Sequence, residues 1–307
     1  MSTIDPLAPT GAAGADRSRR RLRSSLRKAA AGRVAVLPLL LFVAVAFGLP
    51  AVAMAYGSFT TYAPGQPSHY TTGNLSASLS GGYLTALLGS VKLSAIAALI
   101  ATVLGLLLAQ AVVTSRFEVL RHAVLSASGV LANFGGVPLA FAFIATLGNN
   151  GLLTQHLHLT AAGWNLYDLT GLGLVYLYFL IPLMVLTVIP ALDGLRKQWR
   201  EAAQNNGAGL WQYWRYVALP VLTPSLLGGF VLLFGSAFAA YATAAAMVGA
   251  GGAVPLITLQ IAASLNGNVD ANATNVALAM SLDMVVISVL VMAVYLPLQR
   301  RSARWLV

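Results

Sequence analysis

The sequence predicts an all-α, polytopic membrane protein with six transmembrane helices. Three observations lead to this fold class: 58% of the residues are hydrophobic and only 8% are charged, several apolar runs reach about 20 residues, and the basic residues gather between those runs. Soluble domains carry about 25% charged residues, so lipid must cover much of this surface. The absence of cysteine excludes disulfides, cysteine-based zinc sites and thiol nucleophiles.

Six runs are long enough to cross the hydrocarbon core, which needs about 20 apolar residues per helix. They are continuously apolar and lack the alternation of a barrel strand, so helices are expected. The runs cover approximately residues 34–56, 88–113, 123–147, 169–190, 221–248 and 276–298. The first run is longer than the apolar core of a cleavable signal, and we interpret it as an uncleaved span.

The positions of the basic residues predict the orientation. Seventeen of the eighteen Lys and Arg residues fall in the two tails and in the loops 114–122 and 191–220, whereas the other three loops contain none. Cytoplasmic loops carry the excess of Lys and Arg, so both termini are expected in the cytoplasm of a bacterial cell, with the chain in its plasma membrane.

The N-terminal residues 1–28 form a polar, basic segment that is expected to be a disordered cytoplasmic tail. Residues 29–307 then make up the transmembrane domain. Eight basic residues lie next to the first apolar run. This placement favours contact with membrane lipid over nucleic-acid binding.

Small residues recur at a spacing of four in two of the runs, which places them on one helix face where a second helix can approach closely. In the second run these residues are Ala97, Ala101, Gly105 and Ala109, and in the fifth run they are Gly235, Ala239 and Thr243.

The loop 191–220 is long and mixed in character. Residues 195–203 predict a short helix, Gly207 and Gly209 predict a turn, and residues 210–217 predict a second short helix. Leu219 and Pro220 then begin the fifth span, because proline suits the first turn of a helix.

Within this loop, Glu201-Ala202-Ala203 is followed by three residues, Gly207, nine residues, and then Val217-Ala218-Leu219-Pro220. This spacing resembles the EAA loop of the permease family of binding-protein-dependent ABC importers. The family pattern has Ile where this chain has Val217, and commonly an apolar residue where this chain has Asn206. An amphipathic helix resting at the lipid headgroups is the alternative interpretation of the segment.

The resemblance implies a type I ABC importer permease fold and a permease subunit that is not itself an enzyme. In that family the loop is a knob that inserts into a groove of a cytoplasmic ATPase dimer. Ala202 and Ala203 would keep the knob slim, Gly207 would permit its turn, and Leu219-Pro220 would close the motif. Glu201 would supply a polar anchor, either to the partner or as a contact at the start of a helix.

The resemblance also implies further partners: a second permease subunit, identical or different, and an extracytoplasmic substrate-binding protein. The chain has no phosphate-binding loop of the Gly-x-x-x-x-Gly-Lys-Ser/Thr type, so a separate subunit would hydrolyse ATP. No cofactor or metal is expected, and His156 and His158 are weak candidates for metal ligands.

Polar residues inside spans are costly and usually face the interior of the bundle. Asn133, Tyr241 and Asp283 are therefore hypothesised to border a translocation path. Residues 133–141 resemble the branch of these permeases that serves spermidine and putrescine, whose relatives serve ferric ion, thiamine, phosphonate or sulfate. An acid at Asp283 would suit a cationic polyamine.

Two other classes stay open at this point. An ion-coupled secondary transporter would carry ionisable residues near the midplane and inverted repeats. A membrane assembly or signalling protein would need no transport path at all.

Overall fold

The computed structural model describes residues 38–61, 68–249, 254–266 and 272–303, and the expected basic tail at 1–28 lies outside these ranges. Within them, six helical stretches are long and apolar enough to cross a membrane. The first, Pro38–Ser58, includes a π-helical turn, η1 (Ala44–Gly48), and α2 (Leu49–Ser58). Residues up to Tyr56 belong to one unit and residues from Gly57 onward to a second.

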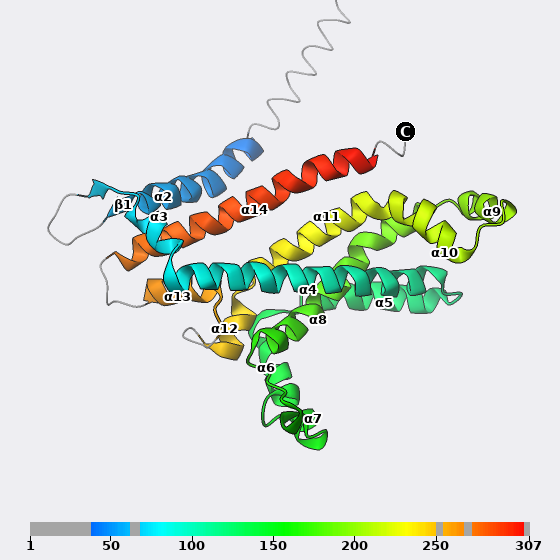
Figure 1. The fold of residues 1–307 in the computed structure, drawn as a ribbon, viewed down its shortest axis with the longest axis horizontal. Helices are drawn as coiled ribbons and strands as arrows, with labels where there is room; N and C mark the ends of the chain where they lie inside the picture. Colours follow the sequence, from blue (N-terminus) through cyan, green and yellow to red (C-terminus); the bar gives the residue numbers. More distant parts are fainter. Residues whose placement is uncertain (1–37, 62–67, 250–253, 267–271, 304–307) are drawn as a thin grey trace, which may run out of the picture. The chain divides into compact units, whose positions relative to one another are not determined.

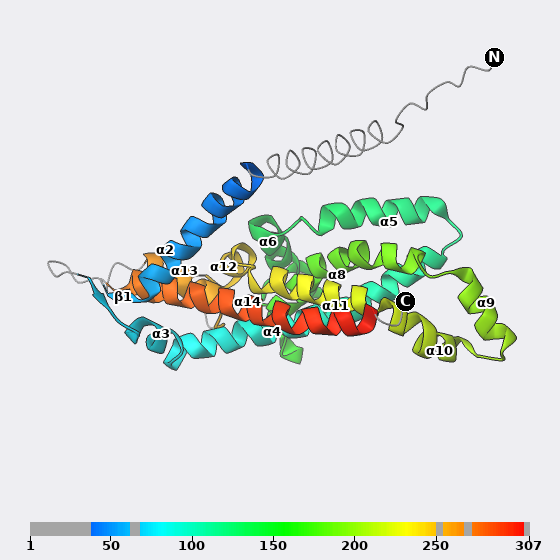
Figure 2. The same ribbon diagram turned by 90° about the horizontal axis from the view of Figure 1, so that it is seen from above.

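Four long helices of the second unit lie side by side (Figures 1 and 2): α4 (Gly81–Thr114), α8 (Leu169–Asp193), α11 (Leu219–Phe238) and α14 (Ala273–Ala303). Helix α4 packs mainly on α8 and α11, and α14 packs on α11. The most buried span is α8, because neighbouring helices cover it on several sides.

The small residues of the second run face the interior of the bundle, and Gly105 makes the close helix approach that was predicted, against α8. Ala97, Ala101 and Ala109 are buried. A Cβ atom added to Gly105 would lie 2.6 Å from the Cβ of Met184, and one added to Gly229 of α11 would lie 2.6 Å from the Met184 sulfur. The Met184 side chain therefore fills the junction of three helices at a place where only glycine leaves room.

The third run is not one straight span, which corrects the prediction of a helix over 123–147. It consists of α5 (Glu118–Leu131), an irregular stretch, and α6 (Gly136–Leu147), which runs across the direction of the long helices (Figures 1 and 2). Gly136 has φ +74°, a conformation that favours glycine. Pro138 cannot donate a backbone hydrogen bond, so it suits the first turn of α6.

The fifth run is also interrupted, and the helix predicted over 221–248 was wrong in that respect. Helix α11 ends at Phe238, and a separate α12 (Ala242–Val248) follows. The small residues predicted to share one face of this span therefore do not lie on one helix. Gly235 is exposed, and a Cβ atom there would meet nothing within 4 Å.

Side chains satisfy backbone groups that the two interruptions free. The Tyr176 hydroxyl of α8 donates to the Ala240 carbonyl at 3.0 Å, and the Gly136 N–H donates to the Thr243 hydroxyl at 2.9 Å. Broken helices persist inside membranes only where neighbouring groups replace the lost hydrogen bonds. Thr243 lies on α12, so its hydrogen bond also joins the two interruptions.

Short elements close the end of the unit where α4 begins. Strands β1 (Thr60–Thr61) and β2 (His69–Tyr70) pair antiparallel and precede α3 (Gly73–Ser78). The buried Asn74 carboxamide donates to the Thr60 carbonyl at 2.8 Å and accepts from Asn272 Nδ2 at 2.7 Å. These bonds tie the hairpin and α3 to the start of α14.

The remaining elements are α7 (Leu152–His156), the 3-10 turn η2 (Leu159–Ala162) and α13 (Ile257–Asn266). Helix α13 packs on α14 and α4, and the Ile257 N–H donates to the Ser90 hydroxyl at 2.9 Å. Asp168 precedes α8 and caps it, because its side chain accepts a hydrogen bond from the Gly171 N–H at 2.8 Å.

Candidate functional site

The loop between the fourth and fifth spans folds into a compact helical hairpin. It contains α9 (Lys197–Asn205), a turn, α10 (Leu210–Tyr213) and a π-helical turn, η3 (Trp214–Ala218). The hairpin lies at one end of the long helices, beyond the ends of α8 and α11 (Figure 1). We call residues 195–220, which carry the motif predicted to couple the chain to an ATPase, the coupling loop.

Gly207 ends α9 in a left-handed conformation with φ +77°. Its N–H donates to the Gln204 carbonyl at 2.9 Å, and the Ala208 N–H donates to the Ala203 carbonyl at 2.9 Å. This pair of bonds is a Schellman motif, which satisfies the free carbonyls at a helix end and strongly favours glycine. The structure therefore gives a physical reason for a glycine at this position of the loop.

The second half of the loop is capped in a different way. The Gly209 N–H donates to the Gln212 side-chain oxygen at 2.8 Å, as in a capping box. A glutamine three residues after the N-cap is typical of this motif, so the position of Gln212 could have predicted the cap from the sequence.

No break separates the second short helix from the fifth span. Residues Leu210–Phe238 form one continuous helix of 29 residues, so Pro220 lies within it and not at a free helix start. The π-helical turn just before Pro220 is marked by the bond from the Leu219 N–H to the Trp214 carbonyl. A wider turn of this kind relieves the clash between a proline ring and the preceding turn.

A hollow of about 740 Å³ lies inside the hairpin. One wall comes from α9 and the residue that follows it, and includes Ala202, Ala203 and Asn206. The opposite wall includes Tyr216 and Pro220. The alanines thus keep open a concave surface between the two arms of the loop. Trp199 and Arg196 also line this hollow, with the guanidinium 5.8 Å from the ring centre, and neither was predicted as a site residue.

Glu201 is exposed on α9 and makes no hydrogen bond or ion pair with any other described residue. Two roles were expected for Glu201: an anchor to a partner, or a contact at the start of a helix. The second contact is not present among the described residues. Leu219 is also partly exposed, at 36%. Both side chains are available to a partner.

An ion pair holds the neighbouring loop near this end of the bundle. Arg121 of α5 donates to the Asp193 carboxylate at 2.5 Å, where α8 ends. Both side chains are more than one-third exposed, so the pair contributes little to stability and mainly fixes geometry.

The three predicted path residues do not form one cluster in this structure. Asn133 lies in the interruption between α5 and α6, where its Nδ2 donates to the Gly129 carbonyl at 2.9 Å, and Tyr241 lies in the interruption between α11 and α12. Both are exposed, and the Gly136–Thr243 hydrogen bond joins their surroundings. Asp283, in contrast, is 9% exposed within α14 and faces Ser78 of α3.

His156 and His158 are both exposed. No group of three or more His, Cys, Asp or Glu residues in the described ranges is placed to hold a metal ion.

These features define a multi-pass membrane protein with interrupted spans and a helical hairpin at one end of its bundle. The chain belongs to the family described as binding-protein-dependent transport system inner membrane component, whose model matches residues 101–304. Membership places it in a multi-pass inner-membrane class of transport permeases, as the loop motif predicted.

Curated relatives match over part of their length. The chain is 39% identical over 94 residues to the inner membrane ABC transporter permease protein YdcU of Escherichia coli K12, covering 30% of each protein. It is 33% identical over 116 residues to the probable sulfate transport system permease protein cysT of Anthoceros angustus, covering 34% of this chain and 39% of that protein. A match to the molybdenum transport system permease protein ModB of Escherichia coli K12 has 28% identity over 151 residues, 48% of this chain and 65% of that protein. The chain thus spans about a third of the first two relatives.

Solved structures support the fold over a larger part of the chain. A chain of a bacterial ABC transporter involved in the import of the acidic polysaccharide alginate aligns with a TM-score of 0.67 and 16% identity, covering 92% of this chain and 99% of that one. A chain of the MetNI methionine ABC transporter aligns with a TM-score of 0.54 and 18% identity, covering 71% and 95%. At these identities the likeness shows the fold, which is that of an ABC importer permease.

Proposed function

We propose that this chain is the permease subunit of an ATP-driven importer and that its coupling loop receives force from a separate ATPase dimer. The observation that carries the proposal is the Glu-Ala-Ala…Gly motif folded as an exposed hairpin, with Gly207 in a Schellman turn. Family membership over residues 101–304 supports the same conclusion.

The geometry of the loop suits a docking element. Glu201 projects from α9 without an internal partner, so it can pair with a basic residue of the ATPase. Charged hydrogen bonds across an interface add specificity as well as energy. The second arm continues without interruption into α11, so motion of the hairpin is passed directly into the membrane.

The proposed assembly contains a second permease subunit, identical or different, and an extracytoplasmic substrate-binding protein. One of the structural neighbours is an alginate ABC transporter in complex with a periplasmic protein bound to an alginate pentasaccharide. With the coupling loop on the cytoplasmic side, both termini of this chain lie in the cytoplasm, because six spans return it to the side on which it began.

For the cargo we favour a small oxyanion over a polyamine. Two of the named relatives are sulfate and molybdenum permeases. The residues at the two interruptions, Asn133, Tyr241 and Thr243, are uncharged, and Asp283 packs toward α3. A polyamine remains the alternative that the resemblance of residues 133–141 and the acid at Asp283 favour.

The coupling role is tested by retention of the ATPase during purification of the membrane complex. Glu201→Ala should release most of the ATPase, whereas Gln198→Ala, an exposed neighbour on the same helix, should retain it. ATP-dependent uptake into vesicles should fall in parallel for Glu201→Ala alone. Equal retention by both variants, or uptake that continues without ATPase, would exclude the role.

The path is tested by uptake through Asn133→Ala and Asp283→Asn variants that still assemble with the ATPase. An oxyanion path near the interruptions predicts slower uptake for Asn133→Ala and little change for Asp283→Asn. The reverse pattern, together with competition by spermidine instead of sulfate, would favour the polyamine alternative. Wild-type rates in both variants would remove these residues from the path.

A further inference from the structure

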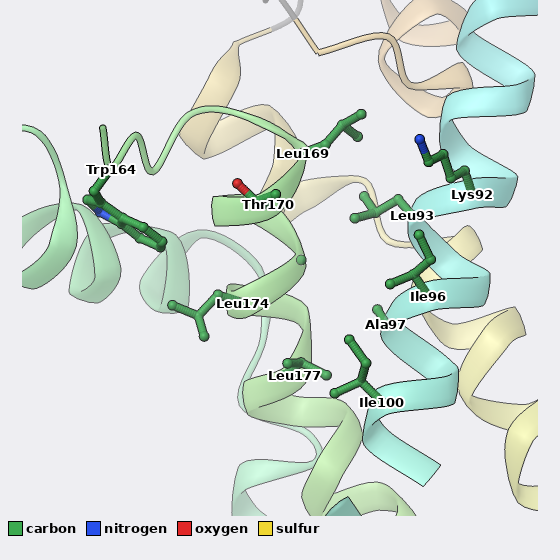
Figure 3. Close-up of a pocket in the computed structure, with 11 residues that line it drawn as sticks. Lys92, Leu93, Ile96, Ala97, Ile100, Trp164, Leu169, Thr170, Leu174 and Leu177 are labelled. Atoms are coloured by element: carbon green, nitrogen blue, oxygen red, sulfur yellow. The ribbon is translucent and has the colours of Figure 1, made fainter. Parts of the chain in front are cut away.

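An apolar slot of about 550 Å³ opens on the surface of the bundle between α4 and α8, at the end away from the coupling loop. Its volume falls in the range of about 300–1,000 Å³ that is typical of ligand pockets. Apart from Lys92 and Thr170, its lining is hydrophobic or glycine. The α4 wall includes Ile96 and Ile100, and the α8 wall includes Leu174 and Leu177 (Figure 3).

The two ends of the slot differ in polarity. Lys92 and Thr170 lie at one end, and Ile100 and Leu177 lie at the other (Figure 3). Lys92 is exposed and makes no ion pair or hydrogen bond with another described residue. It is also the one Lys or Arg between residues 34 and 115, so a single cationic group marks this end of the slot.

The position of Lys92 along α4 matches the edge of the hydrocarbon. It precedes Thr114, the last residue of α4, by 22 residues, which corresponds to about 33 Å of helix. The hydrocarbon core is about 30 Å thick. With Thr114 at one face of the hydrocarbon, the Lys92 ammonium reaches the headgroups of the other face, and the slot extends from it into the acyl-chain region.

The side of the slot opposite α4 carries one aromatic anchor, and one acid caps the start of α8. The Trp164 indole N–H donates to the Leu147 carbonyl at 2.9 Å, which fixes the ring on the flank of the slot. Tryptophan is typical of the membrane interface. The Asp168 carboxylate accepts from the Thr170 hydroxyl at 2.6 Å and from the Gly171 N–H, so the acid at this end of α8 is already bonded within its own helix.

We propose that this slot binds one anionic phospholipid, with the phosphate at Lys92 and an acyl chain along Ile96, Ile100 and Leu177. Lysine is a common point-charge partner of phosphate. The charge of Lys92 supplies the preference for an anionic headgroup, and the apolar walls accept the chain of any phospholipid. The preference for an anionic headgroup therefore depends on Lys92, whereas occupancy of the slot by any phospholipid depends on the apolar walls. Mutations can change the two properties separately.

The test uses purified protein in phosphatidylcholine vesicles that contain a photoreactive phospholipid, with the cross-links mapped to residues 92–100 and 169–177. Photoreactive phosphatidylglycerol should label these segments about five-fold more than photoreactive phosphatidylcholine, the ratio that one basic residue at an anionic lipid supports. Lys92→Gln should reduce the ratio to about one, and Lys92→Arg should keep most of it. Arg116→Gln, two residues beyond the opposite end of α4, is the matched control and should leave the ratio unchanged.

Leu174→Trp should fill the slot and reduce labelling by both lipids. Equal labelling by the two lipids in the wild type, or an undiminished preference in Lys92→Gln, would overturn the proposal. Loss of the preference on adding inorganic phosphate would assign Lys92 to a soluble anion instead. If neither lipid labels the slot, a protein segment covers it, and the proposal is also wrong.

Discussion

Replacing Gly207 by alanine should loosen the coupling loop without touching any neighbouring side chain. A Cβ atom on Gly207 would meet nothing within 4 Å, so the cost comes from the backbone alone. A residue with a Cβ pays about 1–2 kcal/mol in the left-handed conformation that φ +77° requires. This free energy corresponds to a factor of about 5–30 in the population of the closed turn.

Amide hydrogen exchange over residues 197–208 measures this change directly. Gly207→Ala should speed exchange of the Gly207 and Ala208 amides, which make the two Schellman bonds, by about 5–30-fold. Gly207→Asn should have a smaller effect, because asparagine tolerates this conformation better than other residues with a side chain. ATP-driven uptake should decrease in the same order.

Gly209 provides the matched control within the same loop. It has φ −73°, and its N–H is bonded to the Gln212 side chain, which alanine at 209 does not remove. Gly209→Ala should therefore cost less, on the order of half a kcal/mol for the poorer cap. If Gly209→Ala speeds exchange as much as Gly207→Ala, or if neither variant changes it, the argument from the left-handed turn fails.

Three further substitutions test the fold. Gly105→Leu should destabilise the helix junction by about 1–3 kcal/mol, because its side chain must enter the space of Met184, and thermal unfolding in detergent should show a lower midpoint. Tyr176→Phe should cost about 0.5–1.5 kcal/mol because the part-buried hydrogen bond to the Ala240 carbonyl is lost; an unchanged midpoint would contradict the account of the interrupted span. The bonds from the Gly171 N–H and the Thr170 hydroxyl hold the pKa of Asp168 below its usual value. The stability that this carboxylate adds is present above pH ~4 and is lost as the pH falls through the lowered pKa, so Asp168→Asn should flatten the acid side of the stability profile; a profile identical to wild type would contradict this.

The number of spans and the location of the coupling loop could be predicted because they depend on run length and local chemistry. About 20 apolar residues suffice to cross the bilayer whatever the helix packs against. The close approach at Gly105 was also predictable, since a spacing of four places small residues on one face. The partner in that contact, Met184, could not be identified, because it lies about 80 residues further along the chain.

The interruptions were missed because apolar content does not distinguish one helix from two. The run through Asn133 and Gly136 is apolar on both sides, and only the paired glycines before Pro138 signal a break. The break after Phe238 has no local signal, since Ala239 and Ala240 are good helix formers. A distant residue, Tyr176, stabilises it, which is information that a single sequence does not contain.

Of the predicted site residues, the structure brings together those of the coupling loop and separates those of the path. Helix α9 and the turn that ends it contain four of them, Glu201, Ala202, Ala203 and Gly207. Their spacing in the sequence was therefore enough to predict that they lie close together. Asp283 was grouped with Asn133 because both are polar residues within spans. Polarity gives the cost of burial but not the direction in which a side chain points.

The continuous helix from Leu210 to Phe238 would transmit motion of the proposed coupling loop into the membrane-spanning bundle. Its 29 residues correspond to about 43 Å along the helix axis, and they include the π-helical turn Trp214–Ala218 and Pro224. The next residues, Ala239 to Tyr241, are not helical. The helix therefore ends next to the hydrogen bond from the Tyr176 hydroxyl to the Ala240 carbonyl. A displacement at the coupling loop would therefore reach the interruption before α12 through a single hydrogen-bonded element.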